Sequence, residues 1–150
     1  YKSDSFHANG WSLIRRILEE NPDVVDEEEL RSLLQPTRLY HDVVEDMRRF
    51  NVTPKAYAHI TGGGLPGNLE RFLGDYGADL SIPYWDNTAA QKILKHVDPQ
   101  DRFNTFNMGI GWVAIVRPED AEAALKAGPG GTVIGTLREG RGIHVKVQGE

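Results

Sequence analysis

Cysteine is absent from this chain of 150 residues. The chain therefore has no disulfide scaffold, no thiolate metal site and no cysteine nucleophile. Long apolar runs are also absent, because the longest, Trp112 to Val116, is far shorter than the roughly 20 residues that cross a bilayer. Positive charge is sparse: 17 Lys and Arg stand against 22 Asp and Glu, for a net charge of −5. That balance argues against a nucleic-acid partner, which needs clustered cations.

The composition that remains is typical of one globular domain. Apolar residues make up 39% of the chain and charged residues 26%, which does not fit a disordered tail. The length suffices to bury about two-thirds of the unfolded surface. No signal peptide is visible, and with no cysteine the sequence predicts a cytoplasmic protein without a membrane partner. The chain opens with Tyr1 directly before a motif, so we expect a piece of a longer protein.

Apolar spacing predicts helices alternating with strands. The expected helices are 11–18, 26–34, 36–47, 67–73, 88–97 and 121–127, and the expected strands are 55–60, 79–82, 112–116, 132–137 and 143–147. In the third helix Tyr40, Val43, Val44 and Met47 share one face, which we expect to meet the core. The last two strands are expected to pair as a hairpin. The fold class is α+β (layered α/β), with one mixed β-sheet flanked by helices.

The segment from Ala58 to Gly64 carries the strongest functional signal. His59 and Thr61 are two apart, so both point to one face of a strand. Gly62, Gly63 and Gly64 follow, and they let the backbone come close to a ligand at the start of a helix, where free N–H groups favour an anion. A flexible, helix-capping connector is the alternative. The glycines match neither the phosphate-loop pattern nor the dinucleotide fingerprint.

Two further segments offer anion-compatible groups. His7-Ala8-Asn9-Gly10 stands before the first helix, where Asn9 either caps the helix or joins a binding site. Arg38 follows Pro36 and is expected in the first turn of the third helix, where the helix dipole disfavours a cation. Either Arg38 reaches an anion or a partner carboxylate, or it forms an ordinary helical pair with Asp42.

Other candidates are weaker. Gly109 and Gly111 lie on one face before an apolar strand, so that a neighbouring chain or a ligand can approach. His41, His96 and His144 lack partners at metal-ligand spacing and are expected on the surface, so no metal site is predicted. Trp85 and Trp112 are expected to be core aromatics. No nucleophile elbow and no catalytic carboxylate pair stands out.

Taken together and in order, four motifs resemble a known family. They are His7 through Leu13, Pro36 through Tyr40, Ala58 through Gly64 and Thr105 through Gly111. These segments are similar to the C-terminal half of aminoimidazole ribonucleotide synthetases, also called phosphoribosylformylglycinamidine cyclo-ligases or the PurM family. The resemblance covers essentially the whole chain. Ala8 stands where the family usually has Ser, Trp11 where it has Tyr or Phe, and Asn104 where it has Arg.

The resemblance implies an enzyme of purine biosynthesis that uses ATP and Mg. ATP activates the formyl amide oxygen of formylglycinamidine ribonucleotide, and the amidine nitrogen then closes the imidazole ring. It implies a single domain, residues 1–150, that forms one side of the active-site cleft, while a missing N-terminal half holds the ATP loop, the metal-binding acids and the main homodimer interface.

His7 and His59 are the candidates for catalytic residues. Asn9, Gly10, Arg38, Thr61, Gly62, Gly63 and Gly64 are the candidates for substrate or phosphate binding. Whether His59 transfers a proton or only donates a hydrogen bond is open. Other ATP-dependent members of the superfamily are alternatives: formylglycinamidine ribonucleotide synthetase, selenophosphate synthetase or a HypE-like maturation protein. A non-catalytic phosphate-binding or interaction module is another.

Overall fold

The computed structural model describes residues 1–149, and its elements confirm the α+β class. The helices are α1 (Trp11–Glu20), α2 (Glu27–Leu33), α3 (His41–Arg49), α4 (Gly64–Leu73), α5 (Thr88–Leu94), α6 (Pro99–Thr105) and α7 (Ala121–Leu125), the last preceded by a 3₁₀ turn, η1 (Pro118–Asp120). The strands are β1 (Ala56–His59), β2 (Tyr76–Ile82), β3 (Trp112–Ile115), β4 (Gly135–Glu139) and β5 (Ile143–Val147).

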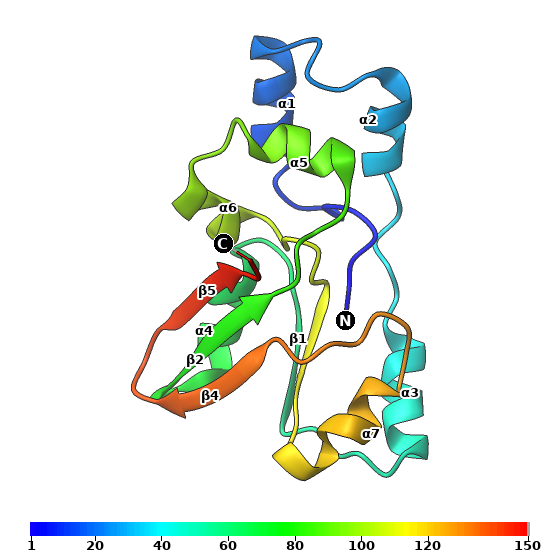
Figure 1. Ribbon diagram of the computed structural model, residues 1–150, viewed down its shortest axis with the longest axis vertical. Helices are drawn as coiled ribbons and strands as arrows, with labels where there is room; N and C mark the ends of the chain where they lie inside the picture. The colour runs from blue at the N-terminus through cyan, green and yellow to red at the C-terminus, as the bar shows by residue number, and fades with distance from the viewer. Residues whose placement is uncertain (150) are drawn as a thin grey trace.

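The strands form two small sheets rather than the single sheet expected from the sequence. In one, β1 pairs antiparallel with β3, and His59 lies opposite Trp112. In the other, the order is β4-β2-β5, with β4 antiparallel and β5 parallel to β2 (Figure 1).

The expected hairpin between the last two strands is therefore wrong. β2 lies between β4 and β5, and the loop that joins them crosses the start of β2 at Gly77. A side chain at Gly77 would collide with the carbonyl oxygens of Gly140 and Gly142. Sequence alternation shows that both strands exist, but not that a third strand separates them.

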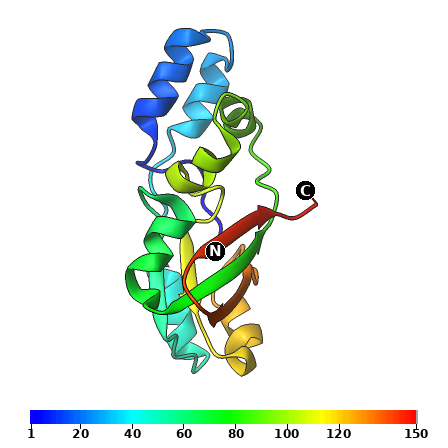
Figure 2. The ribbon, with the colours of Figure 1, turned by 90° about the vertical axis from the view of Figure 1, so that its left-hand side faces the viewer.

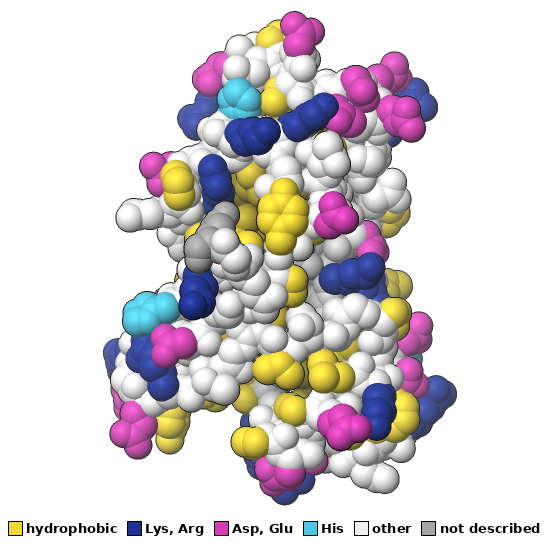
Figure 3. Space-filling model, viewed as in Figure 1, with side chains coloured by type: hydrophobic (Ala, Val, Ile, Leu, Met, Phe, Trp, Pro, Cys, Tyr) yellow, Lys and Arg dark blue, Asp and Glu magenta, His cyan; other side chains and the backbone are white. Residues whose placement is uncertain are grey.

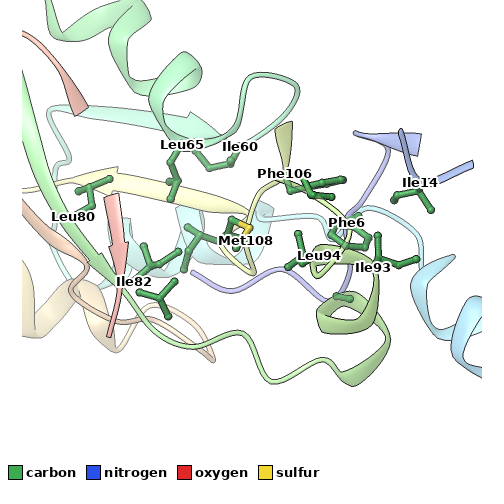
Figure 4. Close-up of a cluster of buried hydrophobic side chains, with 14 of the residues drawn as sticks. Phe6, Ile14, Ile60, Leu65, Leu80, Ile82, Ile93, Leu94, Phe106 and Met108 are labelled. Atoms are coloured by element: carbon green, nitrogen blue, oxygen red, sulfur yellow. The ribbon is translucent and has the colours of Figure 1, made fainter. Parts of the chain in front are cut away.

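One hydrophobic core runs through most of the molecule. It joins the inner faces of α1, α4 and α5 to both sheets, with Phe6, Ile60, Leu65, Ile82 and Phe106 among its buried side chains (Figure 4). Helices α1, α2 and α5 gather at one end of the elongated domain, and α4 runs beside the strands (Figures 1 and 2). Phe6 and Phe106 pack ring against ring at 4.6 Å, which brings the N-terminal segment against the turn that leads to β3.

A second core cluster lies under α3. Tyr40, Val43 and Met47 are buried there as predicted, against Ala124 and Ala127 at the end of α7, while Val44 is only half-buried. The helix begins at His41 and not at Pro36. Residues 35–40 form neither helix nor strand, and the side chains of Arg38 and Tyr40 bond to other parts of the chain.

Helix boundaries follow local capping chemistry at two places. Asp26 and Glu29 form the expected capping box, each side chain bonding to the other residue's backbone N–H. Helix α6 was not expected from apolar spacing, since none of its residues is fully buried. Its signal is the pair Asp98-Pro99, where the carboxylate accepts from the Gln100 N–H and proline occupies the first turn.

Candidate functional site

His7 and His59 lie side by side, although they come from separate segments. His59 is the last residue of β1 and its side chain is exposed, whereas His7 lies in the N-terminal segment and is 4% exposed. The centroids of the two imidazole rings are 6.3 Å apart. The structure therefore brings together the two residues that the sequence offered as catalytic candidates.

His7 is held in one hydrogen-bonding state by its surroundings. Its Nε2 accepts from the backbone N–H of Arg38 at 3.4 Å, which places the proton of the neutral ring on Nδ1. Burial, followed by the neighbouring His59, lowers the pKa of His7. Among residues 1–149 no acceptor bonds to Nδ1, which is itself buried. The ring is thus a neutral donor without a partner.

The backbone around His7 is also unusual. Its φ angle is +55°, a conformation that non-glycine residues rarely adopt. Two polar groups hold the segment in place: Asn107 donates to the Ser5 carbonyl at 2.9 Å, and the Ser5 hydroxyl accepts from the His7 N–H at 3.1 Å. Asn107 is 1% exposed, and its bond to Ser5 satisfies the buried side-chain amide. This bond accounts for a polar residue at a buried position in the turn before β3.

Aromatic rings form the wall behind the two histidines. Tyr40 stacks on Trp112 with 5.5 Å between centroids, and both rings approach His59 at about 6 Å. Gly111 makes this packing possible, because a side chain there would collide with the Tyr40 hydroxyl and touch His7. At Gly109 a side chain would meet Trp85. The paired glycines before β3 thus admit neighbouring aromatic rings.

A buried asparagine shapes the glycine loop. The Asn68 side-chain amide donates to the carbonyls of Thr61, Gly62 and Gly64, at 3.2, 3.3 and 2.7 Å. Its carbonyl oxygen accepts from the Thr61 hydroxyl at 3.1 Å. Because these carbonyls turn inward, no hydrogen bond among residues 1–149 uses the N–H groups of Gly62 and Gly63. Those two donors remain available to an anion.

The sequence did not single out Asn68, although a signal was present. Leu65, Asn68 and Leu69 share one helical face, and all three are buried. A polar side chain on an apolar stripe needs hydrogen-bond partners. That conflict could have marked Asn68 as the residue that organises the loop.

The remaining glycines and Asn9 differ in their surroundings. Asn9 lies next to the loop, since its Oδ1 would be 3.6 Å from a Cβ at Gly62. Gly64 is a packing position, because a side chain there would collide with the Phe103 carbonyl. Gly10 precedes α1 with a positive φ, and a Cβ there would collide with the Phe106 ring. The segments that carry His7 and His59 are thus neighbours beyond the two rings.

Arg38 lies beside the site, but not at a helix start. Its guanidinium donates to the carbonyls of Lys2 at 3.1 Å and Pro129 at 3.3 Å, and lies 5.3 Å from the Tyr40 ring. The sequence offered an anion, a partner carboxylate or a pair with Asp42. Among residues 1–149 the guanidinium bonds to backbone carbonyls and not to Asp42, while contact with an anion stays a prediction. Arg38 thereby connects the start of the chain, the segment before α3 and the loop after α7.

Within residues 1–149, acidic and imidazole groups do not gather into a cluster of metal ligands. Among residues 1–149 no group of three or more His, Asp or Glu side chains could hold an ion. His41, His96 and His144 are exposed as expected, and His144 bonds to Asp79 at 2.9 Å. No helix within those residues is long and apolar enough to cross a membrane.

These features define a class: an α+β domain whose two histidines and glycine loop lie beside an aromatic wall. A family model described as AIR synthase related protein, C-terminal domain, matches residues 1–148. The chain belongs to this family, which confirms the resemblance found in the four motifs.

Curated relatives agree with the family. A phosphoribosylformylglycinamidine cyclo-ligase of Prochlorococcus marinus (strain MIT 9211) is 38% identical over 136 residues, covering 83% of this chain and 39% of the relative. The enzyme of that name from Caldicellulosiruptor bescii is 37% identical, over 96% of this chain and 47% of the relative. The one from Neisseria gonorrhoeae is 38% identical, over 97% of this chain and 46% of the relative. The chain thus spans less than half the length of these relatives.

Proposed function

We propose that this domain forms one side of the active-site cleft of a phosphoribosylformylglycinamidine cyclo-ligase. In the complete protein it would bind formylglycinamidine ribonucleotide during ATP-dependent ring closure to aminoimidazole ribonucleotide. The names of the relatives support this assignment. The observation that carries it is the approach of His7 to His59, 6.3 Å between rings, beside a loop whose Gly62 and Gly63 N–H groups are free of internal bonds.

Each group in the site suits a phosphorylated substrate that gains negative charge during the reaction. The Gly62 and Gly63 N–H groups would bind phosphate oxygens, because peptide dipoles fixed by Asn68 need no reorganisation. The lowered pKa of His7 keeps it neutral, so its Nδ1–H would donate a hydrogen bond without adding a buried charge. His59 is exposed beside it, where it would contact the reacting amide or amidine.

Residues 1–149 contain no group of three or more His, Asp or Glu side chains that could hold an ion by themselves. In the proposal those residues bind and orient the ribonucleotide. In our proposal the ATP loop and the metal-binding acids belong to the N-terminal half of the complete, homodimeric, cytoplasmic enzyme. This chain alone would then bind the ribonucleotide weakly and not turn it over.

The function can be tested by joining the chain to an N-terminal half from one of its relatives. Formation of aminoimidazole ribonucleotide and ADP would be followed with formylglycinamidine ribonucleotide and ATP, for the joined protein and for the chain alone. The proposal predicts product only from the joined protein. Turnover by the chain alone, or turnover of selenide or a peptide thiocarboxamide precursor in place of the ribonucleotide, would contradict it.

A further inference from the structure

Trp11 forms a hydrogen bond to the backbone of His7. Its indole Nε1 donates to the His7 carbonyl oxygen at 2.6 Å. The two residues are four apart, but the bond is not a helical one, because α1 begins at Trp11 and its first turn closes with the bond from the Ile14 N–H to the Gly10 carbonyl. Among residues 1–149 no other donor bonds to the His7 carbonyl.

The turn between the two residues brings the indole back to this carbonyl. His7 has a φ angle of +55° and Gly10 one of +77°, so that a left-handed residue stands at each end of the turn. Glycine adopts this conformation freely, whereas histidine adopts it only where its surroundings hold it. The Trp11 ring is half-buried and packs against the main core. Its N–H is therefore a fixed support for the unusual backbone of His7.

Three neighbours together use almost every hydrogen-bonding group of His7. Its N–H donates to the Ser5 hydroxyl at 3.1 Å, its carbonyl accepts from Trp11, and its Nε2 accepts from the Arg38 N–H at 3.4 Å. Among residues 1–149 only Nδ1 of the buried ring lacks a partner. Because the backbone is held on both sides of the Cα atom, these bonds also fix the direction of the Nδ1–H donor.

A simpler explanation is that the Trp11 N–H finds the nearest acceptor, as buried indoles usually do. Trp85 offers a comparison, since it is half-buried against the same core. Among residues 1–149 the hydrogen bonds of Trp85 involve its backbone carbonyl and not its indole N–H. A half-buried indole in this domain thus does not require such a bond. At Trp11 the bond supports a buried residue in a rare conformation, whose carbonyl would otherwise lose its donor.

We propose that Trp11 is a positioning residue for His7, and that its indole N–H holds the His7 backbone in the conformation from which the ring presents Nδ1–H to the ligand. Trp11 acts through His7 rather than on the ligand. The consequence for turnover rests on the function proposed above, whereas the position of the His7 ring is a property of the chain by itself.

The protonated nitrogen of the His7 ring reports this position. In the unchanged chain the Arg38 N–H at Nε2 keeps the proton on Nδ1. Without the Trp11 N–H the backbone of His7 leaves its rare conformation, and the ring loses the bond from Arg38. The proton then lies mainly on Nε2, as in a solvated imidazole. Burial, then His59, Asp4 and Arg38, set the pKa of His7. Because burial lowers it, the pKa rises when the ring reaches water.

The test removes the indole N–H and keeps an aromatic ring. Trp11→Phe is the variant, and Trp85→Phe is its matched control. Long-range NMR correlations from ring protons to ring nitrogens give the tautomer and the pKa of His7. Exposed histidines are the internal reference: histidine side chains open to solvent are visible on one face of the domain (Figure 3), and both His96 and His144 are exposed. Should Trp11→Phe not fold, β-benzothienylalanine at this position replaces the N–H by sulfur with little change of shape.

We expect Trp11→Phe to move the proton of neutral His7 from Nδ1 mainly to Nε2 and to raise the pKa of the ring. Trp85→Phe should leave both as they are, and the signals of His96 and His144 should be the same in every variant. An unchanged His7 tautomer in the folded Trp11 variant would overturn the proposal. Equal changes in the Trp11 and Trp85 variants would also overturn it, because they would indicate a general loosening of the core.

Kinetics of the protein joined to an N-terminal half test the consequence for the reaction. Trp11→Phe should lower kcat about tenfold and change KM for the ribonucleotide by less than about twofold. In a His7→Ala background the same substitution should cost no further turnover, because no ring is left to position. Equal losses in both backgrounds would refute positioning. A joined protein without any turnover would contradict the proposed function instead, and the NMR spectra would still decide the role of Trp11.

Discussion

Tyr40 and Trp112 stack with their ring planes 17° apart, and the Tyr40 hydroxyl donates to the Lys2 carbonyl at 3.0 Å. Tyr40 comes from the segment before α3, Trp112 from the start of β3 and Lys2 from the start of the chain. The pair therefore links three separate segments directly behind His59. Gly111 leaves the space in which the Tyr40 hydroxyl lies.

Gly111→Ala should lower the free energy of unfolding by about 1–3 kcal/mol, because the new methyl group would overlap Tyr40 and touch His7. In a Tyr40→Phe background the loss should be smaller, since the nearest colliding atom is gone. Denaturant unfolding of the unchanged protein, the two single variants and the double variant measures the coupling free energy between positions 40 and 111. Gly67→Ala is the matched control: nothing lies within 4 Å of a side chain there, so α4 should be stabilised by about 0.5–1 kcal/mol. Equal losses at Gly111 in both backgrounds would refute the packing argument.

Asn68→Ala should destabilise the domain by about 2–4 kcal/mol, because carbonyls of the glycine loop would lose their donor in a buried setting. The loop would also lose its shape, so phosphate affinity should fall along with stability. Thermal and denaturant unfolding check the first effect, and a phosphate titration checks the second. Asn104→Ala changes an exposed asparagine and should stay within about 0.5 kcal/mol. A stable Asn68→Ala protein with an unchanged loop would rule out this role.

His59→Ala should affect chemistry rather than folding. The side chain is exposed, so its removal should change the free energy of unfolding by less than about 0.5 kcal/mol. In the complete enzyme, turnover should fall about 100-fold or more if the ring transfers a proton or binds the reacting group. His41→Ala, at an exposed position outside the site, should retain full turnover. Parallel losses of stability and turnover in His59→Ala would favour a structural role.

Stability should depend on pH through the amino group of Tyr1. Its pKa falls from 8.0 in the unfolded chain to about 6 in the folded one, so the unfolded state binds the proton more tightly. A chain that begins at Tyr1 should therefore lose roughly 2–3 kcal/mol of stability as the pH falls from about 8 to about 6.

Acetylation of the Tyr1 amino group should abolish that part of the pH dependence. Burial lowers the pKa of His7 as well. The stability that comes from the neutral His7 ring is therefore also lost as the pH falls. Comparison with an acetylated His7→Gln protein separates the two groups. A pH profile that acetylation does not alter would contradict the buried position of the amine.

Local signals in the sequence predicted most elements of this fold. The Asp26 and Glu29 capping box, the apolar face of α3 and the strand before the glycines all act over a few residues, and the structure has each of them. The pairing of strands depends on contacts between distant segments. For that reason β2 between β4 and β5, and the division into two sheets, did not follow from the sequence.

The proximity of the candidate residues was predicted in part: His7 and His59 lie with their rings 6.3 Å apart, and their roles stay predictions. His7, His59 and the glycines stood out because their chemistry suits a ligand better than a core. The helical position predicted for Arg38 was wrong, since helix α3 begins at His41 and the guanidinium of Arg38 bonds to the carbonyls of Lys2 and Pro129. The stacked wall of Tyr40 and Trp112 was missed, because it arises only when separate segments meet. Asn68 was missed although its signal is local, since its bonds reach back only four to seven residues.

The central claim is that His7, His59 and the loop N–H groups form one binding surface for a phosphorylated ribonucleotide. An NMR titration of the isotope-labelled chain with aminoimidazole ribonucleotide tests it directly. Resonances of the His7 and His59 rings and of the Gly62 and Gly63 amides should move together with one dissociation constant, while the exposed His96 and His144 stay unchanged. Shifts at only one histidine, or shifts confined to a distant surface, would contradict the claim.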